Sequence, residues 1–462
     1  MLFVPSNAAV RVAWRDELRA SLALAWPLVL GNLAQTVLTT TDVIVIGRLG
    51  ANELAAGTLG VNLYLGPLLF ATGLVTATSP MMATALGRKL HSLRELRRTF
   101  RQGLWSAVLI ALPCWLLLWN SEAVLLALGQ APRLAAEAQS FLRLLQWGVL
   151  PALGFVVLRA FVSVIERPVW AMVVTAAAIL FNIAANWILV FGHLGLPALG
   201  LRGSGLATAL SNTFMFVSFA GIVAFHPRFR RYRLFGRWWR SDLPRLSALW
   251  RLGLPIGASL AFEVTVFNAA AFFMGWLDTV AIAAHAIVLQ IATMTFMVPL
   301  GIGQAATVRV GLARGADDVE GVTRAGWTAF GLAVAFMAVM SAMMVLLPRS
   351  LIGVFIDLGD RGNAGVTDLA VAFLMWAAVF QIADGIQVAA AGMLRGLQDT
   401  RALMVYAAAG YWGVGMSSSL LLAFSAGFGG VGIWMGLAAG VVAVAAALMT
   451  RWLGRERLGL VT

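Results

Sequence analysis

The stretch GLPIGASLAFEVTVFNAAAFFMG, residues 253–275, decides the fold of this chain. It exceeds the ~20 apolar residues that a helix needs to cross a bilayer, and Glu263 is its only charged residue. A carboxylate in hydrocarbon costs roughly 2.5–3.5 kcal/mol on insertion scales, so an acid that is kept there usually marks an ion or substrate pathway. The stretch therefore predicts a membrane-spanning helix that carries a functional carboxylate.

The composition of the whole chain extends this prediction. The sequence is 61% hydrophobic and only 11% charged, whereas soluble proteins average about 25% charged residues, so a soluble protein is excluded. Apolar runs bounded by charge, glycine or proline predict an all-α membrane protein with twelve transmembrane helices, at residues 20–47, 54–84, 102–119, 135–158, 170–191, 204–225, 253–276, 280–308, 325–347, 366–392, 403–424 and 429–450.

The basic residues predict the orientation of these helices. Of the 33 basic residues, 27 fall on one side of the expected spans, Arg159 and Arg395 among them. Because basic residues concentrate in cytoplasmic loops, we expect both termini in the cytoplasm. Segment 226–250 is the longest polar interruption, and its arginines and tryptophans predict an amphipathic helix on anionic headgroups. This topology accounts for the basic balance without a nucleic-acid partner.

An internal repeat relates the two halves of the chain. A shift of 228 residues places Pro27 on Pro255 and Gly73 on Gly301. With six spans per repeat the halves share one orientation, as in parallel-repeat transporters that work by alternating access. The predicted organisation is an N-terminal six-helix lobe at 1–225, a basic cytoplasmic linker at 226–250 and a C-terminal six-helix lobe at 251–462.

Two acids are predicted at one depth in the second lobe. Glu263 follows Arg251 by 12 residues and Asp384 precedes Arg395 by 11, which corresponds to about 18 and 16 Å of helix. No basic residue is adjacent to either acid in the sequence. Two carboxylates together in a low dielectric do not both ionise readily, so the pair can hold a shared proton or exchange it for a cation. The alternative, that both acids are protonated and only donate hydrogen bonds, stays open.

A third acid, Asp42, lies 23 residues beyond Arg19, or about 34 Å along a helix. We expect it near the external end of its span, where water solvates a carboxylate at low cost, so a secondary coupling role and a solvated interfacial acid are both open. Other polar and aromatic residues in the spans are candidates to line a substrate cavity, namely Gln35, Asn182, Asn186, Phe380, Gln381 and Gln387.

Several segments resemble the multidrug and toxic compound extrusion (MATE) transporters, in particular their NorM-like bacterial branch. They are Ala25-Trp-Pro27-Leu with Thr41-Asp42, Gly253-Leu-Pro255-Ile-Gly257 with Glu263, Gly301-Ile-Gly-Gln-Ala-Ala-Thr-Val-Arg309-Val-Gly311, and Gln381-Ile-Ala-Asp384-Gly-Ile-Gln387.

The resemblance implies efflux of cationic, lipophilic compounds against inward flow of H⁺ or Na⁺. It also implies a monomer in the bacterial inner membrane that needs no cofactor beyond the coupling ion. The residues themselves offer no enzyme site, so we expect no enzyme. Glu263 and Asp384 match the family's cation-coupling acids, and Asp42 matches the acid of span one. Asn182 and Asn186 stand where some relatives carry a further proton-coupling acid.

The same residues argue against three alternatives to a drug antiporter. A lipid-linked precursor flippase of the same superfamily is the main one, although acidic mid-membrane charges argue against its anionic cargo. A major facilitator would carry an aspartate ahead of Gly87-Arg88-Lys89, and a membrane enzyme would need a nucleophile or a metal constellation; this sequence has neither feature.

The coupling ion stays open between Na⁺ and H⁺. Backbone carbonyls and water could complete a Na⁺ site at Glu263 and Asp384, but Phe380 offers no oxygen ligand, which slightly favours H⁺.

Overall fold

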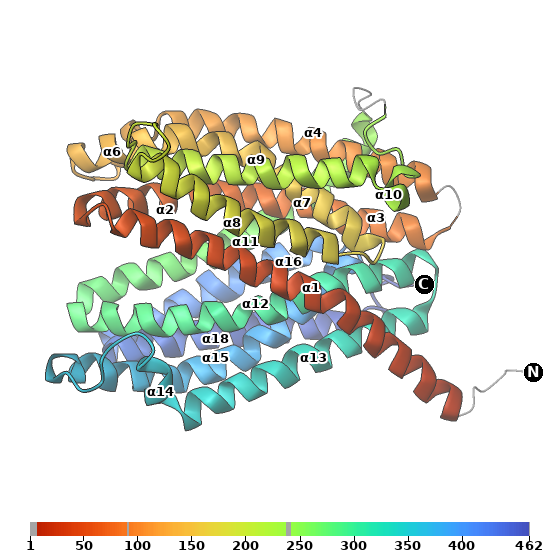
Figure 1. The fold of residues 1–462 in the computed structure, drawn as a ribbon. Helices are drawn as coiled ribbons and strands as arrows, with labels where there is room; N and C mark the ends of the chain where they lie inside the picture. The colour runs from red at the N-terminus through yellow and green to blue at the C-terminus, as the bar shows by residue number, and fades with distance from the viewer. Residues whose placement is uncertain (1–6, 90–91, 237–241, 462) are drawn as a thin grey trace, which may run out of the picture. The chain divides into compact units, whose positions relative to one another are not determined.

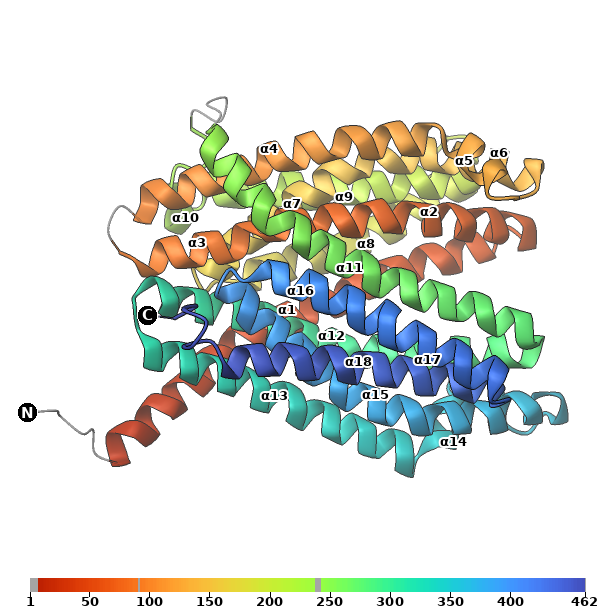
Figure 2. The same cartoon turned by 180° about the vertical axis from the view of Figure 1, so that it is seen from behind.

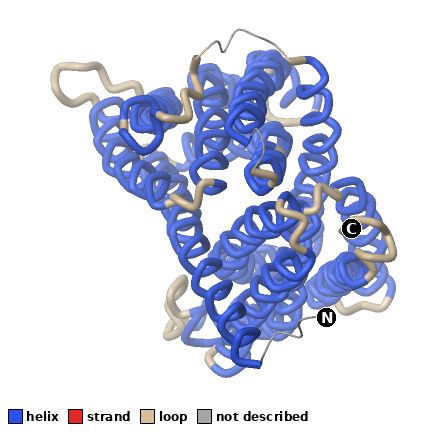
Figure 3. The backbone as a smooth tube through the Cα atoms, turned by 90° about the vertical axis from the view of Figure 1, so that its right-hand side faces the viewer, coloured by secondary structure: helices blue, strands red, loops and turns tan. Residues whose placement is uncertain are grey.

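All regular structure that the computed structural model describes, in residues 7–89, 92–236 and 242–461, is helical, and these residues contain no β-strand (Figure 3). Within them, 12 helical segments are long and apolar enough to cross a membrane, so the predicted count is confirmed. The segments are Arg11–Gly47, Ala51–Gly87, Ser92–Trp119, Pro132–Val164, Val169–Phe191, Leu201–Phe225, Leu243–Leu277, Thr279–Gly315, Val319–Leu346, Arg361–Gly396, Thr400–Ser425 and Gly429–Leu453.

The chain forms two compact units whose boundaries cut two helices. One unit comprises Met1–Val29 and Ala258–Thr462, and the other comprises Leu30–Gly257. Helices α1 (Asn7–Gly47) and α11 (Leu243–Leu277) each belong partly to both units. The lobe boundaries predicted from the sequence stay a prediction, since this division follows contacts rather than the repeat.

The unit Leu30–Gly257 is built around α9, which packs against α6, α7 and α8. Figure 1 shows α4, α7 and α9 running along one another in this unit. Its complete elements are α2 (Ala51–Thr76), α3 (Thr78–Gly87), α4 (Ser92–Trp119), α5 (Ser121–Ala127), α6 (Pro132–Leu145), η1 (Gln146–Gly148), α7 (Val149–Val164), α8 (Val169–Phe191), α9 (Leu201–Phe225) and α10 (Pro227–Arg230).

The other unit is built around α15, which packs against α12, α13 and α18. Figure 2 shows α16 and α17 following the course of α18. The complete elements of this unit are α12 (Thr279–Gly315), α13 (Val319–Leu346), α14 (Pro348–Ile352), η2 (Arg361–Asn363), α15 (Ala364–Gly396), α16 (Thr400–Ala407), η3 (Ala408–Met416), α17 (Ser417–Leu420), η4 (Leu421–Ser425) and α18 (Gly429–Leu453).

The repeat seen in the sequence has an equivalent in backbone contacts. A Cβ atom on Gly73 would come within 2.5 Å of the Gly257 Cα, inside the unit Leu30–Gly257. A Cβ atom on Gly301 would come within 2.8 Å of the Val29 backbone nitrogen, inside the other unit. The same shift of 228 residues relates Gly73 to Gly301 and Val29 to Gly257. Glycine is required at both places because the helix backbones approach too closely for a side chain.

A proline lies just before the unit boundary in each divided helix. Pro27 is inside α1, and Pro255 is inside α11. Proline removes one helical hydrogen bond and is the commonest cause of a helix bend. The two helices therefore have a weakened turn at the point where they pass from one unit to the other.

Two arginines that the sequence places in loops, next to the expected spans 135–158 and 366–392, lie inside helices. Arg159 is within α7, and its Nη1 donates to the Asn32 Oδ1 at 3.3 Å. Arg395 is in the last turn of α15. The loop placement of these two arginines is wrong, because the long apolar stem of an arginine allows the helix to continue past it. The side of the membrane on which they lie stays a prediction.

The described part of the linker differs from the predicted headgroup-bound helix. Among the described residues of the linker before α11, the only helix is the four-residue α10. The side chain of Phe229 in α10 is 1% exposed. Phe229 and Tyr232 pack edge to face against Phe161 of α7, at ring-centroid distances of 6.4 and 5.3 Å. The segment thus contributes to the interior of its own unit. The predicted amphipathic helix falls partly on residues 237–241, which lie outside the described residues.

Candidate functional site

Glu263 and Asp384 meet inside one unit. Glu263 lies midway along α11 and is partly buried, and Asp384 lies midway along α15 and is 4% exposed. The two carboxyl groups are close enough to interact electrostatically. Their proximity agrees with the common depth that helix counting predicts, while their role in coupling stays a prediction.

Arg395 adds a basic group that the sequence analysis did not place here. Its guanidinium interacts electrostatically with Glu263. Within the described part of the chain, the buried Arg395 Nε has no hydrogen-bond acceptor. The cluster of Glu263, Asp384 and Arg395 has one excess negative charge when both carboxyls are ionised, so a single bound proton makes it neutral. Glu263 has no adjacent basic residue in the sequence, but the fold brings Arg395 close to it.

Tyr411 completes this cluster and was also missed. It lies in η3, a stretch of π-helix, is 3% exposed and interacts electrostatically with both carboxylates. The Gln387 Nε2 donates a hydrogen bond to the Tyr411 Oη. π-Helical turns within α-helices are rare and occur often at functional sites. The π-helix places a phenol beside the acid pair, where it can stabilise either protonation state by donating or accepting a hydrogen bond.

Two other candidates on α15 are enclosed by neighbouring helices. The Gln381 Nε2 donates to the Thr295 Oγ1 at 2.6 Å and to the Ala292 backbone oxygen at 3.3 Å, which ties α15 to α12. Phe380 is 4% exposed and packs edge to face with Phe267 and Trp434. Neither side chain faces open space in this conformation, and lining of a substrate cavity stays a prediction for both.

Asp42 forms a second site, inside the unit Leu30–Gly257. Its Oδ1 accepts hydrogen bonds from the Asn182 Nδ2 at 3.0 Å and the Asn186 Nδ2 at 2.8 Å. Its Oδ2 accepts one from the Thr208 Oγ1 at 2.7 Å. Both asparagines are fully buried in α8. Asp42 is thus bound by protein donors and is not a carboxylate held only by interfacial water.

Thr208 is the residue of this second site that the sequence analysis missed. A signal was available, because Ser204, Thr208 and Ser211 recur at spacings of four and three along α9 and so share one helix face. Gln35 is on α1 two turns before Asp42, but within the described residues its side chain makes no hydrogen bond. Gln35 therefore stays a candidate from sequence alone.

Comparison with known proteins identifies the family. The MatE family model matches residues 27–188 and 255–421, which together make up more than half of the chain. The chain belongs to the MatE family. The two matched segments of this MatE protein begin 228 residues apart, in agreement with the internal repeat.

Relatives of this MatE chain are similar over nearly their full lengths. "Probable multidrug resistance protein NorM" of Mesorhizobium japonicum is 59% identical over 445 residues, covering 96% of this chain and 95% of the relative. The protein of the same name from Brucella suis is 52% identical, covering 95% and 93%. The resemblance to the NorM-like branch is confirmed, and the chain is a multi-pass membrane transporter rather than an enzyme.

Solved structures share the fold at low sequence identity. The eukaryotic MATE transporter AtDTX14 superimposes with a TM-score of 0.85 at 21% identity, covering 95% of this chain and 96% of that one. A mutant of the Vibrio cholerae MATE transporter VcmN gives a TM-score of 0.85 at 17% identity, covering 97% and 99%. These likenesses establish the fold of the MatE chain.

Proposed function

We propose that this chain is a proton-coupled antiporter that exports cationic, lipophilic drugs or toxic organic compounds by alternating access. It lies in the bacterial inner membrane with both termini in the cytoplasm and works as a monomer. The single observation that carries the coupling mechanism is the cluster of Glu263, Asp384 and Arg395. Efflux of drugs is supported by the names of the NorM relatives.

The fixed guanidinium of Arg395 favours H⁺ over Na⁺ as the coupling ion. A sodium ion at Glu263 and Asp384 would be repelled by Arg395, which interacts electrostatically with Glu263. A proton is carried as a neutral carboxyl group and meets no such repulsion. Because one proton neutralises the cluster, binding and release of that proton change the charge of the cluster by one unit. The three side chains of the cluster do not have to move for this change.

Competition for the carboxylates links the proton to the substrate. When Glu263 and Asp384 are both ionised, the excess negative charge attracts a cation, and protonation removes that attraction. Phe380 is packed against Phe267 and Trp434 in this conformation. A lipophilic cation would gain the roughly 0.5–2 kcal/mol of a ring face in a conformation that opens this packing. The excess negative charge of this cluster would repel an anionic lipid-linked sugar, so the flippase alternative is not favoured.

The proposal is tested by comparing driving forces for wild-type protein in proteoliposomes. Export of a fluorescent cationic dye is followed under a pH gradient alone and under a Na⁺ gradient alone. We expect the pH gradient to drive export and the Na⁺ gradient at equal pH to give the rate of protein-free liposomes. Export driven by Na⁺ alone would overturn proton coupling, and absence of export under both gradients would overturn cationic-drug transport.

A further inference from the structure

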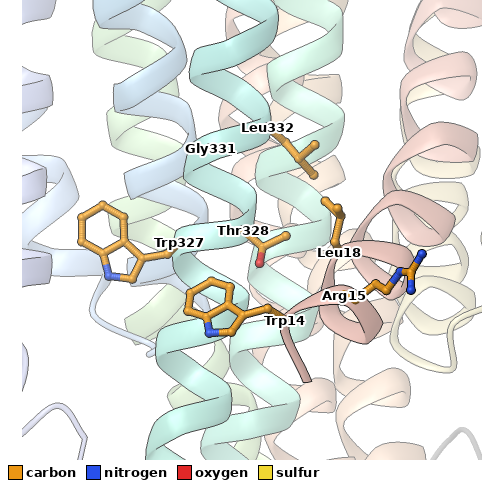
Figure 4. A pocket seen from close by; sticks show the side chains of 7 residues that line it. All are labelled: Trp14, Arg15, Leu18, Trp327, Thr328, Gly331 and Leu332. Atoms are coloured by element: carbon orange, nitrogen blue, oxygen red, sulfur yellow. The ribbon is translucent and has the colours of Figure 1, made fainter. Parts of the chain in front are cut away.

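A groove lies between the first half of α1 and α13, away from the carboxylate cluster. Its volume is about 400 Å³, within the range of ~300–1,000 Å³ typical of ligand pockets. Both walls belong to one compact unit. Figure 4 shows the lining side chains, which are Trp14, Arg15 and Leu18 of α1 and Trp327, Thr328, Gly331 and Leu332 of α13.

The lining changes from polar to apolar along the helices. Arg11 and Arg15 lie one turn apart near the start of α1, and Leu18 follows on the same face. On α13, Arg324 precedes Thr328 by one turn, and Leu332 lies one turn further. Arg324 is paired with Asp318 and Glu320, at 3.5 and 3.0 Å, so the unpaired positive charge at this end comes from α1. Figure 4 shows Leu18 and Leu332 at one end of the groove and Trp14 nearer the other. The groove therefore has a basic end, where Arg15 lies level with Trp14, and an aliphatic end at Leu18 and Leu332.

The charge at the basic end favours an anion. Arg15 is exposed and has no carboxylate partner within the described residues. The nearby Glu17 is already engaged, because both of its oxygens accept hydrogen bonds from Arg309 at 2.9 and 2.6 Å. Asp16 follows Arg15 directly, so it projects about 100° away around the helix. A cationic substrate would meet repulsion at Arg15.

A membrane lipid matches this order of chemistry. Tryptophan is enriched where the headgroups meet the hydrocarbon, and basic residues just outside that level attract anionic lipids. Trp14 and Leu18 are 38% and 40% exposed at the protein surface, so a molecule in the groove stays in contact with the bilayer.

We propose that the groove binds one anionic phospholipid. Its phosphate lies at Arg15, its glycerol region lies between Trp14 and Trp327, and an acyl chain follows Leu18 and Leu332. The bound lipid bridges α1 and α13 within one unit. Since the rest of α1 belongs to the other unit, the lipid stabilises the packing of only the first half of this helix.

Gly331 allows the groove to be filled without disturbing the fold. A Cβ atom added at this residue has no neighbour within 4 Å, so the side chain of Gly331→Leu extends into the groove. Leucine is also the better helix former. Gly221→Leu on α9 is the matched control, because a Cβ there likewise has no neighbour within 4 Å. Arg15→Gln removes the charge and keeps an exposed side chain of similar reach.

Native mass spectrometry of the purified proteins, titrated with phosphatidylglycerol or phosphatidylcholine, tests the proposal. We expect one tightly retained phosphatidylglycerol on wild type and on Gly221→Leu. Retention falls about fivefold in Arg15→Gln, the equivalent of ~1 kcal/mol per arginine at an anionic surface, and is lost in Gly331→Leu.

Equal retention of phosphatidylcholine, or unchanged retention of phosphatidylglycerol in Gly331→Leu, would overturn the proposal. Displacement of the lipid by a cationic dye in proportion to its concentration would assign the groove to substrate instead. Thermal unfolding of each variant confirms that all are folded. Because lipid retention is measured without an ion gradient, its outcome does not depend on which ion drives export.

Discussion

Asp384→Asn is expected to abolish concentrative export while leaving the protein folded. With one proton exchanged per monovalent cation, a pH difference of one unit supports a dye gradient of about tenfold, since each 1.4 kcal/mol is a factor of ten. The asparagine variant cannot release a proton from this position, so its dye gradient falls to that of empty liposomes. Glu263→Gln is expected to give the same result, and dye fluorescence in proteoliposomes under a fixed pH gradient measures both.

A control on the same helix separates this effect from a general loss of charge. Asp368 lies near the start of α15, and its side chain is 76% exposed beside Arg349. Asp368→Asn is expected to export at the wild-type rate. Wild-type export by Asp384→Asn and Glu263→Gln, at equal protein content, would leave the two acids with a structural role and remove the basis for coupling at the cluster.

Asp42→Asn is expected to reduce export strongly with little change in stability, whereas Asp42→Ala is expected to destabilise the protein. In the asparagine variant, the remaining oxygen still accepts from Asn182 and Asn186, and the new amide group can donate to the Thr208 hydroxyl. Alanine leaves the buried Asn182 Nδ2 without its acceptor, which costs ~1–3 kcal/mol. The Asn186 Nδ2 and the Thr208 hydroxyl lose one acceptor each but still donate to Asn182 and to the Ser204 backbone oxygen. Thermal unfolding in detergent and dye export together distinguish the two variants.

Thr208→Val serves as the matched control for the Asp42 site. It removes one of three hydrogen bonds and keeps the ionisable carboxyl group. We expect it to lower the unfolding temperature modestly and to retain coupled export. If Asp42→Asn exports as well as Thr208→Val does, Asp42 is a structural acceptor and takes no part in coupling.

Apolar length and period determine which parts of this architecture the sequence reveals. Each span is long enough that its existence does not depend on tertiary contacts, so twelve helices could be predicted from the apolar runs. The repeat was visible because Gly73 and Gly301 each meet a helix backbone, a constraint that fixes residue type at equivalent positions. The common depth of Glu263 and Asp384 followed from simple helix rise.

The parts that the sequence did not reveal depend on contacts between helices. Arg395 lies 11 residues after Asp384, which is close to three turns and so on the same helix face. An arginine at the end of an apolar run usually anchors a helix at the interface, so the sequence alone does not indicate the interaction of Arg395 with Glu263. Tyr411 owes its place to π-helix, which hydrophobic periodicity does not encode. Thr208 meets Asp42 only through the packing of separate helices.

Proton movement caused by substrate movement tests the central claim most directly. Proteoliposomes with equal pH on both sides and a clamped membrane potential contain a pH-sensitive fluorophore, and a cationic dye is added outside. The account predicts that dye uptake by wild type and Asp368→Asn raises the lumenal pH, and that Asp384→Asn gives no pH change. Dye uptake by wild type at constant lumenal pH would contradict proton-coupled exchange at this cluster.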